Sequence, residues 1–462
     1  MQATGLLLLL STCRMVKSMG MPSFQTDWFI MEAQNESYSP LLINHNLPSV
    51  PLKVDVLMKD EVSGVVFSAS PGGAMWDDDL KGSTYCGISY AYDDHVVRLH
   101  APYSTNEYTF TGIICHGGNT WSATDEIVRV RALVKVLVWS EPEIPSPDFM
   151  TKWIAMSSSG LGYAEVEHNL GRDHVLLLVQ VRGYSDEDNT GPWYAQAIGS
   201  SQDPYDVKHR AAVVYGFNAT LVRIWRGLID TSRVPEPKGP PCLICMTDGW
   251  TDFYKNGISV SEGEIRVLAW HQLEIKFQET KLIDTNVDSS MLQVPLGSLT
   301  EDEIDRLTFT VTTEVLDGSN EGFVFTALGA APILLVDEAP DREYGGVVYG
   351  FSSGHVNIWL PSGQNGHVII LRNPWGLGWN RQTSKVGRVR IVAWSWEQPT
   401  SRECHFKLWR GKGGPVHLIP CAKECCDVGL GGCVGVSASV GRCQFFKALD
   451  DAPFNVSVYT RT

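Results

Sequence analysis

The sequence predicts a mainly β protein: three tandem antiparallel β-sandwich modules of jelly-roll-like type, followed by a small disulfide-rich α+β module. Three observations predict this class. One hairpin pattern recurs three times along the 462 residues. Short apolar stretches with period-2 alternation are separated by Gly, Asp and Asn turns, with almost no helical periodicity. Six of the eleven cysteines fall within 404–443, the density of a disulfide-stapled module.

The hairpin pattern occupies residues 85–100, 210–225 and 344–359. In each copy a tyrosine is followed two residues later by a second aromatic residue, and five residues after that by a valine, with no gap. The tyrosines are Tyr90, Tyr215 and Tyr349, and the valines are Val97, Val222 and Val356. A slip of one residue would turn every side chain to the other face, so equal spacing predicts the same hairpin register in all three copies. For the tyrosines, core packing explains the pattern better than ligand binding.

A closing strand follows each hairpin, at 134–139, 265–270 and 389–394. Each alternates apolar residues around one basic residue and ends on tryptophan. The basic residues are Lys135, Arg266 and Arg390. Successive closing tryptophans are 131 and 124 residues apart, a domain-sized period and too long for a solenoid unit of about 20–50 residues. Upstream strands place Phe67, Tyr194 and Phe325 at one shared point, and His-Asn-Leu precedes an apolar strand at 45–47 and 168–170.

These patterns give a domain order. We expect a signal peptide at 1–20, sandwich repeats at 24–140, 150–271 and 272–396, and the cysteine-rich module at 404–462. Three prolines in 140–149 predict a semi-rigid spacer between the first two repeats, whereas the short junction at 270–272 predicts that repeats two and three pack together. At 299–307, Thr300 and Glu303 fit a capping box on a short helix, with an acidic turn as the alternative.

Composition favours an extracellular protein. The chain carries 37 Lys and Arg against 52 Asp and Glu, a net charge of −15, and has no basic run, which disfavours nucleic-acid partners. The apolar run Leu6–Leu10 resembles a secretory signal, with cleavage after Cys13, Ser18 or Gly20; a buried strand or a lipobox are the alternatives. The run is too short to span a bilayer, so no transmembrane anchor is expected. Cleavage would leave ten cysteines, an even number.

Three sequons agree with secretion, at Asn35, Asn218 and Asn455. Within repeat one, Cys86 and Cys115 are expected to form a disulfide. In repeat two, Cys242 and Cys245 are expected to bridge locally. A redox role for this Cys-x-x-Cys would require a βαβ context, which the β-rich repeat does not provide.

The C-terminal cysteines are Cys404, Cys421, Cys425, Cys426, Cys433 and Cys443. The run 421–446 resembles the PAN/apple module, in which a helix bearing two cysteines is tied to a hairpin strand. That resemblance implies the pairs Cys421–Cys443 and Cys425–Cys433, with Cys404–Cys426 for the remaining two. Adjacent Cys425 and Cys426, and only 59 residues from Cys404 to the end, indicate a truncated or divergent copy. The family binds proteins or carbohydrates without catalysis; a generic disulfide knot is the alternative. The three upstream repeats resemble uncharacterised tandem extracellular β-repeats.

Acidic residues recur in a loop before each hairpin, and carboxylates that converge in loops are Ca²⁺ ligands. The candidate ligands are Asp77, Asp79, Asp203, Asp206, Asp337 and Asp341. Their spacing differs among the copies, so a solvated acidic loop is the alternative; no other cofactor is expected. Aromatic residues follow the core strands and suit sugar rings or protein partners, with core packing as the alternative. These candidate ligand-binding residues are Trp121, Trp250, Trp375 and Trp379.

No catalytic signature occurs: the sequence has no G-x-S-x-G, no H-E-x-x-H and no P-loop. The sequence therefore predicts a secreted recognition or adhesion protein, not an enzyme, that binds glycans or extracellular proteins multivalently. A structural component of the extracellular matrix is one alternative. A carbohydrate-active hydrolase on a jelly-roll scaffold is another, and it would require two carboxylates facing each other in a cleft.

Overall fold

The computed structural model is mainly β, as the sequence predicts, and most of its strands lie in antiparallel sheets. It describes residues 18–396, with gaps at 73–83, 104–109, 118–120, 122–125, 142, 157–161, 172–174, 187–188, 200–211, 227–241, 247–256, 272, 287–290, 298, 330–332, 335–343, 362–364 and 372–381. It also describes three strands after residue 434.

The chain divides into two compact units. One contains Lys17–Trp396, and the other contains Met1–Val16 together with Glu397–Thr462. In the second unit, the described strands are β36 (Gly435–Ser439), β37 (Arg442–Lys447) and β38 (Ser457–Tyr459), which pair antiparallel. The C-terminal disulfides predicted from the PAN/apple resemblance, and the resemblance itself, lie outside the described side chains.

Each repeat of the large unit supplies five main strands in the same order. Repeat 1 supplies β4 (Lys53–Lys59), β5 (Val66–Ser68), β8 (Ser89–Tyr92), β9 (Val96–His100) and β13 (Arg131–Trp139). Repeat 2 supplies β17 (Val175–Gly183), β18 (Trp193–Gln196), β19 (Val213–Phe217), β20 (Leu221–Arg226) and β23 (Gly263–His271). Repeat 3 supplies β26 (Leu307–Val315), β27 (Val324–Thr326), β30 (Val348–Phe351), β31 (His355–Trp359) and β35 (Val386–Ser395).

Outer strands extend these groups on both sides. On the closing-strand side they are β1 (Phe24–Gln25), β2 (Phe29–Glu32), β14 (Phe149–Met150), β15 (Ile154–Met156) and β24 (Ile275–Asp284). On the hairpin side they are β3 (Leu41–Asn44), β16 (Tyr163–Glu167) and β25 (Leu292–Pro295). In the large sheet that holds β8, the short strand β6 (Ser70–Pro71) pairs parallel with β8. The smaller sheets use β7 (Thr84–Cys86), β10 (Phe110–Gly112), β11 (Ile114–Gly117), β12 (Glu126–Arg129), β21 (Ile244–Met246), β22 (Ile258–Val260), β28 (Ile333–Leu334), β29 (Tyr344–Gly345), β32 (Gly366–His367), β33 (Ile369–Leu371) and β34 (Gln382–Ser384).

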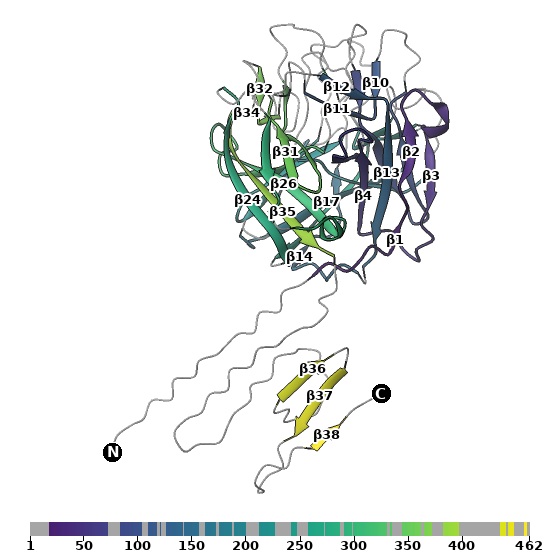
Figure 1. The fold of residues 1–462 in the computed structure, drawn as a ribbon. Helices are drawn as coiled ribbons and strands as arrows, with labels where there is room; N and C mark the ends of the chain where they lie inside the picture. The colour runs from purple at the N-terminus through teal and green to yellow at the C-terminus, as the bar shows by residue number, and fades with distance from the viewer. Residues whose placement is uncertain are drawn as a thin grey trace. The chain divides into compact units, whose positions relative to one another are not determined.

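The three repeats form a closed ring, because the hairpin of each repeat extends a sheet of the next. β8 of repeat 1 pairs with β18 of repeat 2, and β19 of repeat 2 pairs with β27 of repeat 3. β30 of repeat 3 pairs with β5 of repeat 1, which closes the ring. Three large sheets result, each built from two repeats. Figure 1 labels strands of all three repeats within the large unit.

The expected row of three separate sandwiches is therefore corrected to three sandwiches that share their sheets. Each sandwich packs the closing-strand side of a repeat against its own hairpin, around a core made mainly of that repeat's residues, with some from the neighbouring repeats. A fourth core joins all three repeats. It contains the closing tryptophans Trp139, Trp270 and Trp394, together with Leu137 and Leu268. Burial of this apolar surface stabilises all three repeats together, since no repeat can expose its share without opening the ring.

The hairpin register predicted from the sequence is confirmed in all three repeats. Tyr92 pairs with Val97, Phe217 with Val222, and Phe351 with Val356. The alignment of Tyr194 with Phe67 and Phe325 is wrong by one residue. Equivalent backbone bonds from Ala69, Ala197 and Ala327 to Val56, Val179 and Val311 fix the register. Tyr194 therefore corresponds to Val66 and Val324.

The predicted spacer at 140–149 is packed into the fold. Ile144 is buried in the shared core beside Met19, and Leu273 lies there as well. The Pro145 carbonyl accepts from the Trp270 indole. Met19 and Gly20 also belong to the fold, because the Gly20 amide bonds the Glu143 carbonyl and its own carbonyl accepts from Trp139. Cleavage after Gly20 would remove these contacts, whereas cleavage after Cys13 or Ser18 would keep Met19 and Gly20 in the chain; the signal peptide and its boundary stay a prediction.

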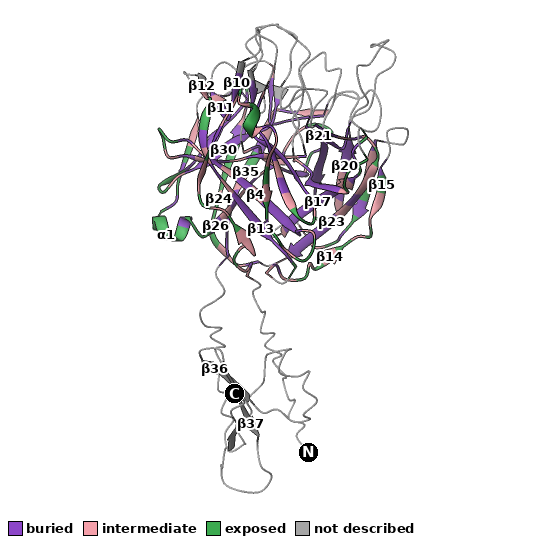
Figure 2. Cartoon of the chain, turned by 90° about the vertical axis from the view of Figure 1, so that its right-hand side faces the viewer, coloured by how far each residue is buried: buried purple, intermediate pink, exposed green. Residues whose placement is uncertain are grey.

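Two local motifs have clear structural roles. In the shared His-Asn-Leu, His45 and His168 each accept the backbone N–H of the leucine two residues later. The other ring nitrogen of each histidine meets a carbonyl of the adjoining hairpin turn. The tripeptide therefore ties β3 or β16 to that turn. The predicted helix is confirmed as α1 (Glu301–Ile304), a single turn with a complete Thr300–Glu303 capping box on the surface (Figure 2).

Candidate functional site

The places where one repeat joins the next, here called seams, share one construction. At the seam between repeats 1 and 2, Arg98 lies 5.4 Å from the Trp193 ring, and at the next seam Arg223 lies 4.1 Å from the Phe323 ring. Such cation–π contacts are worth about 0.5–2 kcal/mol each. Trp225 stacks on Phe325, and Trp359 stacks on Phe67. At the seam between repeats 1 and 2, Tyr92 stacks on Tyr194, so each seam is held by aromatic stacking as well as by strand pairing.

A second set of equivalent places lies beside the seams, over the closing strands. In repeat 2 the Trp153 ring covers Arg182 and Arg266, whose guanidinium carbons are 4.1 and 4.7 Å from its centre. In repeat 1 the Trp28 ring lies over Lys59 and Lys135, each at 5.9 Å. The strand registers make Glu314 and Arg390 the matching residues of repeat 3.

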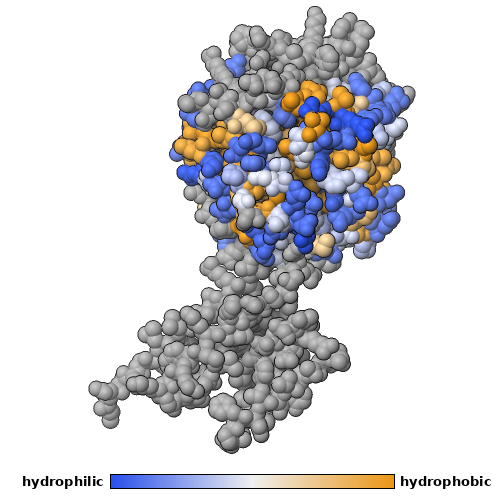
Figure 3. Space-filling model, in the orientation of Figure 1, coloured by the Kyte–Doolittle hydropathy of each residue, from blue (hydrophilic) through white to orange (hydrophobic). Residues whose placement is uncertain are grey.

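In repeat 3 this place is an open groove of about 150 Å³. Its floor carries Thr310, Thr312 and Glu314 from β26 and Arg390 from β35, and Phe217 of repeat 2 forms part of its wall. Arg388 donates to Glu314 at 2.7 Å, and Arg390 donates to Gln278 of β24 at 3.2 Å. On the described surface facing the viewer in Figure 3, hydrophilic and hydrophobic side chains are interspersed. The groove offers hydroxyl, amide, carboxylate and guanidinium groups beside an aromatic ring.

A second cavity of about 150 Å³ adjoins the groove, shares Val175, Phe217, Thr310 and Thr312 with it, and is lined by residues of all three repeats. Tyr90, Tyr215 and Tyr349 line it, and each donates its hydroxyl to a backbone carbonyl of its own repeat. Burial raises the pKa of Tyr215 and of Tyr349 to about 12. These contacts confirm the core role predicted for the three tyrosines.

His116 joins repeats 1 and 3 at the closing seam. Its ring lies 4.2 Å from the Trp359 ring and stacks on Phe67 at 5.4 Å. Burial lowers the pKa of His116 from 6.5 to about 4, although nearby Asp60 acts in the opposite direction. The imidazole is therefore neutral at physiological pH and serves as an aromatic ring in the seam.

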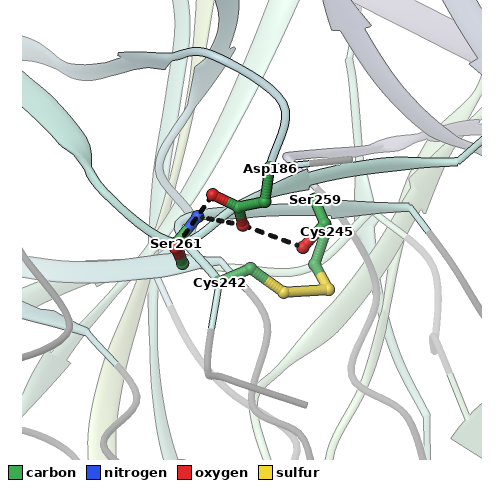
Figure 4. The surroundings of a disulfide bond; sticks show 5 residues. All are labelled: Asp186, Cys242, Cys245, Ser259 and Ser261. Atoms are coloured by element: carbon green, nitrogen blue, oxygen red, sulfur yellow. Dashed lines mark hydrogen bonds between the residues drawn. A yellow bond between two sulfur atoms is a disulfide. The ribbon is translucent and has the colours of Figure 1, made fainter. Parts of the chain in front are cut away.

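Both disulfides predicted in the repeats are confirmed. Cys86 bonds Cys115, and Cys242 bonds Cys245 within one turn. Figure 4 shows the second of these beside Asp186, whose carboxylate accepts from Ser259, from the Ser261 hydroxyl and from the Ser261 backbone N–H. Asp186 belongs to the acidic stretch 185–191, and here it fastens that loop to β22.

Trp121 is corrected as a ligand-binding candidate. Its ring is fully buried, and its indole N–H donates to the Gly346 carbonyl of repeat 3 at 3.0 Å. It therefore packs between repeats 1 and 3 and offers no exposed platform. The other predicted platform residues, Trp250, Trp375 and Trp379, lie outside the described residues.

The predicted Ca²⁺ ligands also lie outside the described residues: Asp77, Asp79, Asp203, Asp206, Asp337 and Asp341. Among the residues that the structure describes, no group of three or more His, Cys, Asp and Glu could hold a metal ion. Within the same part of the chain, no helix is long and apolar enough to cross a membrane.

Of the three sequons, two are described. The Asn35 side chain accepts from the Ser37 backbone and caps the short 3-10 helix Glu36–Tyr38. The Asn218 side chain accepts from the backbone of Thr220 and Leu221 in its hairpin turn. Asn455 lies outside the described residues, and glycosylation of all three stays a prediction.

The groove was not predicted, although the sequence holds a signal for it. Phe-x-Thr-x-Trp occurs at 24–28 and at 149–153, ahead of the closing strand of its repeat, and 277–281 reads FQETK. Thr26 and Thr151 each accept a closing-strand backbone N–H through the side-chain hydroxyl, between the two short outer strands. The motif thus marks the covered places, and its loss in repeat 3 marks the open one.

Comparison with known proteins adds no relationship: no protein-family model, curated protein or solved structure matches the chain.

Proposed function

We propose that this chain is a secreted, non-enzymatic recognition protein that binds glycans on an extracellular surface through several sites at once. The observation that carries the proposal is the closed ring of three repeats with equivalent seams. A cyclic arrangement relates equivalent positions by rotation about one axis, so equivalent loops face the same end of the molecule. Loops at one end of β-sandwiches commonly hold ligands.

In the ring, the distances between equivalent binding sites would be fixed. In a string of flexibly linked modules, the second binding event gains only the effective concentration that the linker allows. In the ring, β5, β18 and β27 occupy equivalent positions at the three seams, and each precedes one of the acidic segments in the sequence. The spacing of these strands is fixed, which favours a repetitive surface such as clustered glycans over a single soluble ligand.

The groove of repeat 3 supports a carbohydrate ligand in particular. Sugar rings are bound by planar polar groups together with an aromatic or apolar face, and the groove offers Arg390, Glu314 and Thr312 beside Phe217. The PAN/apple-like resemblance of residues 404–462 points to the same ligand classes. The two disulfides of the repeats support secretion, because disulfides form and persist in oxidising extracellular environments.

A glycan array probed with the full chain tests this function. We expect binding to a defined subset of glycans, stronger at high printing density than at low density because several sites engage together. A parallel array with EGTA tests the Ca²⁺ sites predicted in the acidic segments. Absence of binding to every glycan at high density, with and without Ca²⁺, would contradict the proposal. Density-independent binding would restrict it to a single site.

A further inference from the structure

Of three structurally equivalent places in the ring, two are covered by a tryptophan of the chain, Trp28 or Trp153, and the one in repeat 3 is the groove. Beside Trp153 lie Arg182, Arg266 and Tyr194 of repeat 2, and Tyr194 pairs with Tyr92 of repeat 1. The strand registers assign the same positions at the next seam to groove-lining residues, namely Glu314, Arg390, Val324 and Phe217. The groove is thus the place that the protein's own tryptophan fills one repeat earlier.

The outer strands explain why only repeat 3 is open. In repeats 1 and 2 the outer strand stops at Thr26 or Thr151, and the chain then carries Trp28 or Trp153 over the sheet. In repeat 3 the outer strand β24 continues for ten residues along β35, with only one irregularity near its start. An unbroken strand keeps its side chains alternating between the two faces, so no residue turns back over the closing strand.

The open place also differs chemically from the covered one. Where repeat 2 has Leu178 and Gln180, the groove has Thr310 and Thr312. Where repeat 2 has Tyr194, it has Val324. The Arg182–Glu264 pair of repeat 2 is reversed into Glu314 and Arg388. In the groove, threonine hydroxyls and a valine thus replace the larger side chains of repeat 2, and Phe217 keeps one wall apolar.

We propose that this groove binds one pyranose unit of a glycan. The C–H face of the ring would lie against Phe217 and Val324, and its hydroxyls would exchange hydrogen bonds with Thr310, Thr312 and Glu314. The volume of about 150 Å³ suits one ring, being below the roughly 300–1,000 Å³ of clefts for drug-sized ligands. The inference rests on the proposed function and assigns it a site that none of the predicted residues includes.

The test measures binding of methyl pyranosides, neutral and carboxylated, to the full chain by ligand-observed NMR. The first variant is Thr312→Val, which removes one groove hydroxyl with little change in volume and keeps the Thr310 hydroxyl that accepts from the Trp394 indole. The second is Thr280→Trp, which places an indole into the groove from β24. The matched control is Thr313→Val, on the opposite, buried face of the same strand.

We expect at least one pyranoside to bind the unchanged chain. Its affinity should fall about two- to tenfold in Thr312→Val, because a net hydrogen bond contributes about 0.5–1.5 kcal/mol. It should be lost in Thr280→Trp and be unchanged in Thr313→Val. Equal affinity in all four proteins would overturn the groove site, while glycan binding on the array would leave the proposed function standing. Binding of indole or of a tryptophan peptide in place of every pyranoside would also overturn it, in favour of an aromatic protein partner.

Discussion

At the scale of single residues, tryptophan has different roles that depend on where it lies in the ring. Trp28 and Trp153 cover cations, Trp121 bridges two repeats, and Trp139 belongs to the shared core. The Phe-x-Thr-x-Trp motif marks Trp28 and Trp153 in the sequence, but the local pattern does not separate the roles of Trp121 and Trp139. Burial decides them, and burial depends on pairing between repeats.

His116 gives a prediction at this scale. Its pKa is about 4 in the folded protein and 6.5 in the reference state, so the unfolded chain binds more protons between these values. Well above pH 6.5, His116 is neutral in both states and does not affect the free energy of unfolding. As the pH falls from 6.5 towards 4, protonation of the unfolded chain lowers the free energy of unfolding, by about 2 kcal/mol at about pH 5. In His116→Phe, which keeps an aromatic ring against Trp359, this part of the acid destabilisation should disappear.

Urea unfolding of both proteins across that pH range measures the effect. The matched control is His95→Phe, since the His95 side chain is 79% exposed. His45 and His168 also have lowered pKa values because of burial, so the His116 variant should retain some pH dependence. An unchanged pH profile in His116→Phe would contradict the role assigned to this ring.

At the scale of elements, the repeated residues predicted the strands well. The ungapped spacing from aromatic residue to valine gave the hairpin register, and the closing strands ending on Trp139, Trp270 and Trp394 pair as their alternation predicts. The packed segment 140–149 was predicted wrongly, because its prolines suggested a spacer while Ile144 is the residue that anchors it. Periodicity reports a strand's two faces, and it does not report which other repeat covers the outer face.

At the seams, the backbones of neighbouring repeats approach each other closely, and this gives a prediction at the scale of elements. A Cβ on Gly199 of repeat 2 would overlap the backbone of Thr326 in repeat 3. Gly199→Ala should therefore lower the free energy of unfolding by about 1–3 kcal/mol, because overpacking forces the strands apart. Gly354→Ala, in a hairpin turn where a Cβ meets nothing within 4 Å, is the matched control and should cause no loss. Equal stability of the two variants, by denaturant unfolding, would show that the seam is looser than described.

At the scale of the whole molecule, ring closure is the feature that sequence reasoning could not reach. Within the large sheets, each seam consists of one pair of facing residues, such as Phe351 with Val66, and β28 with β7 adds a second pairing between repeats 3 and 1. These residues are ordinary strand residues within their own repeats, so nothing in their local pattern identifies a partner 285 positions away. The same holds for the groove, whose wall and floor come from different repeats. The fold class follows from the sequence, whereas the arrangement of the candidate sites follows from the ring.

The most direct test of the ring is a cross-link at its closing seam. Val66 and Phe351 are Cα partners on β5 and β30, and facing residues of antiparallel strands lie about 4.5–5.5 Å apart, within the reach of a disulfide. In the full chain carrying Val66→Cys and Phe351→Cys, peptide mapping after mild oxidation should show a 66–351 disulfide. A chain carrying Val66→Cys and Phe217→Cys, which pairs positions from two different seams, should show none. A folded protein without the 66–351 link, or with equal linking in both chains, would contradict the closed ring.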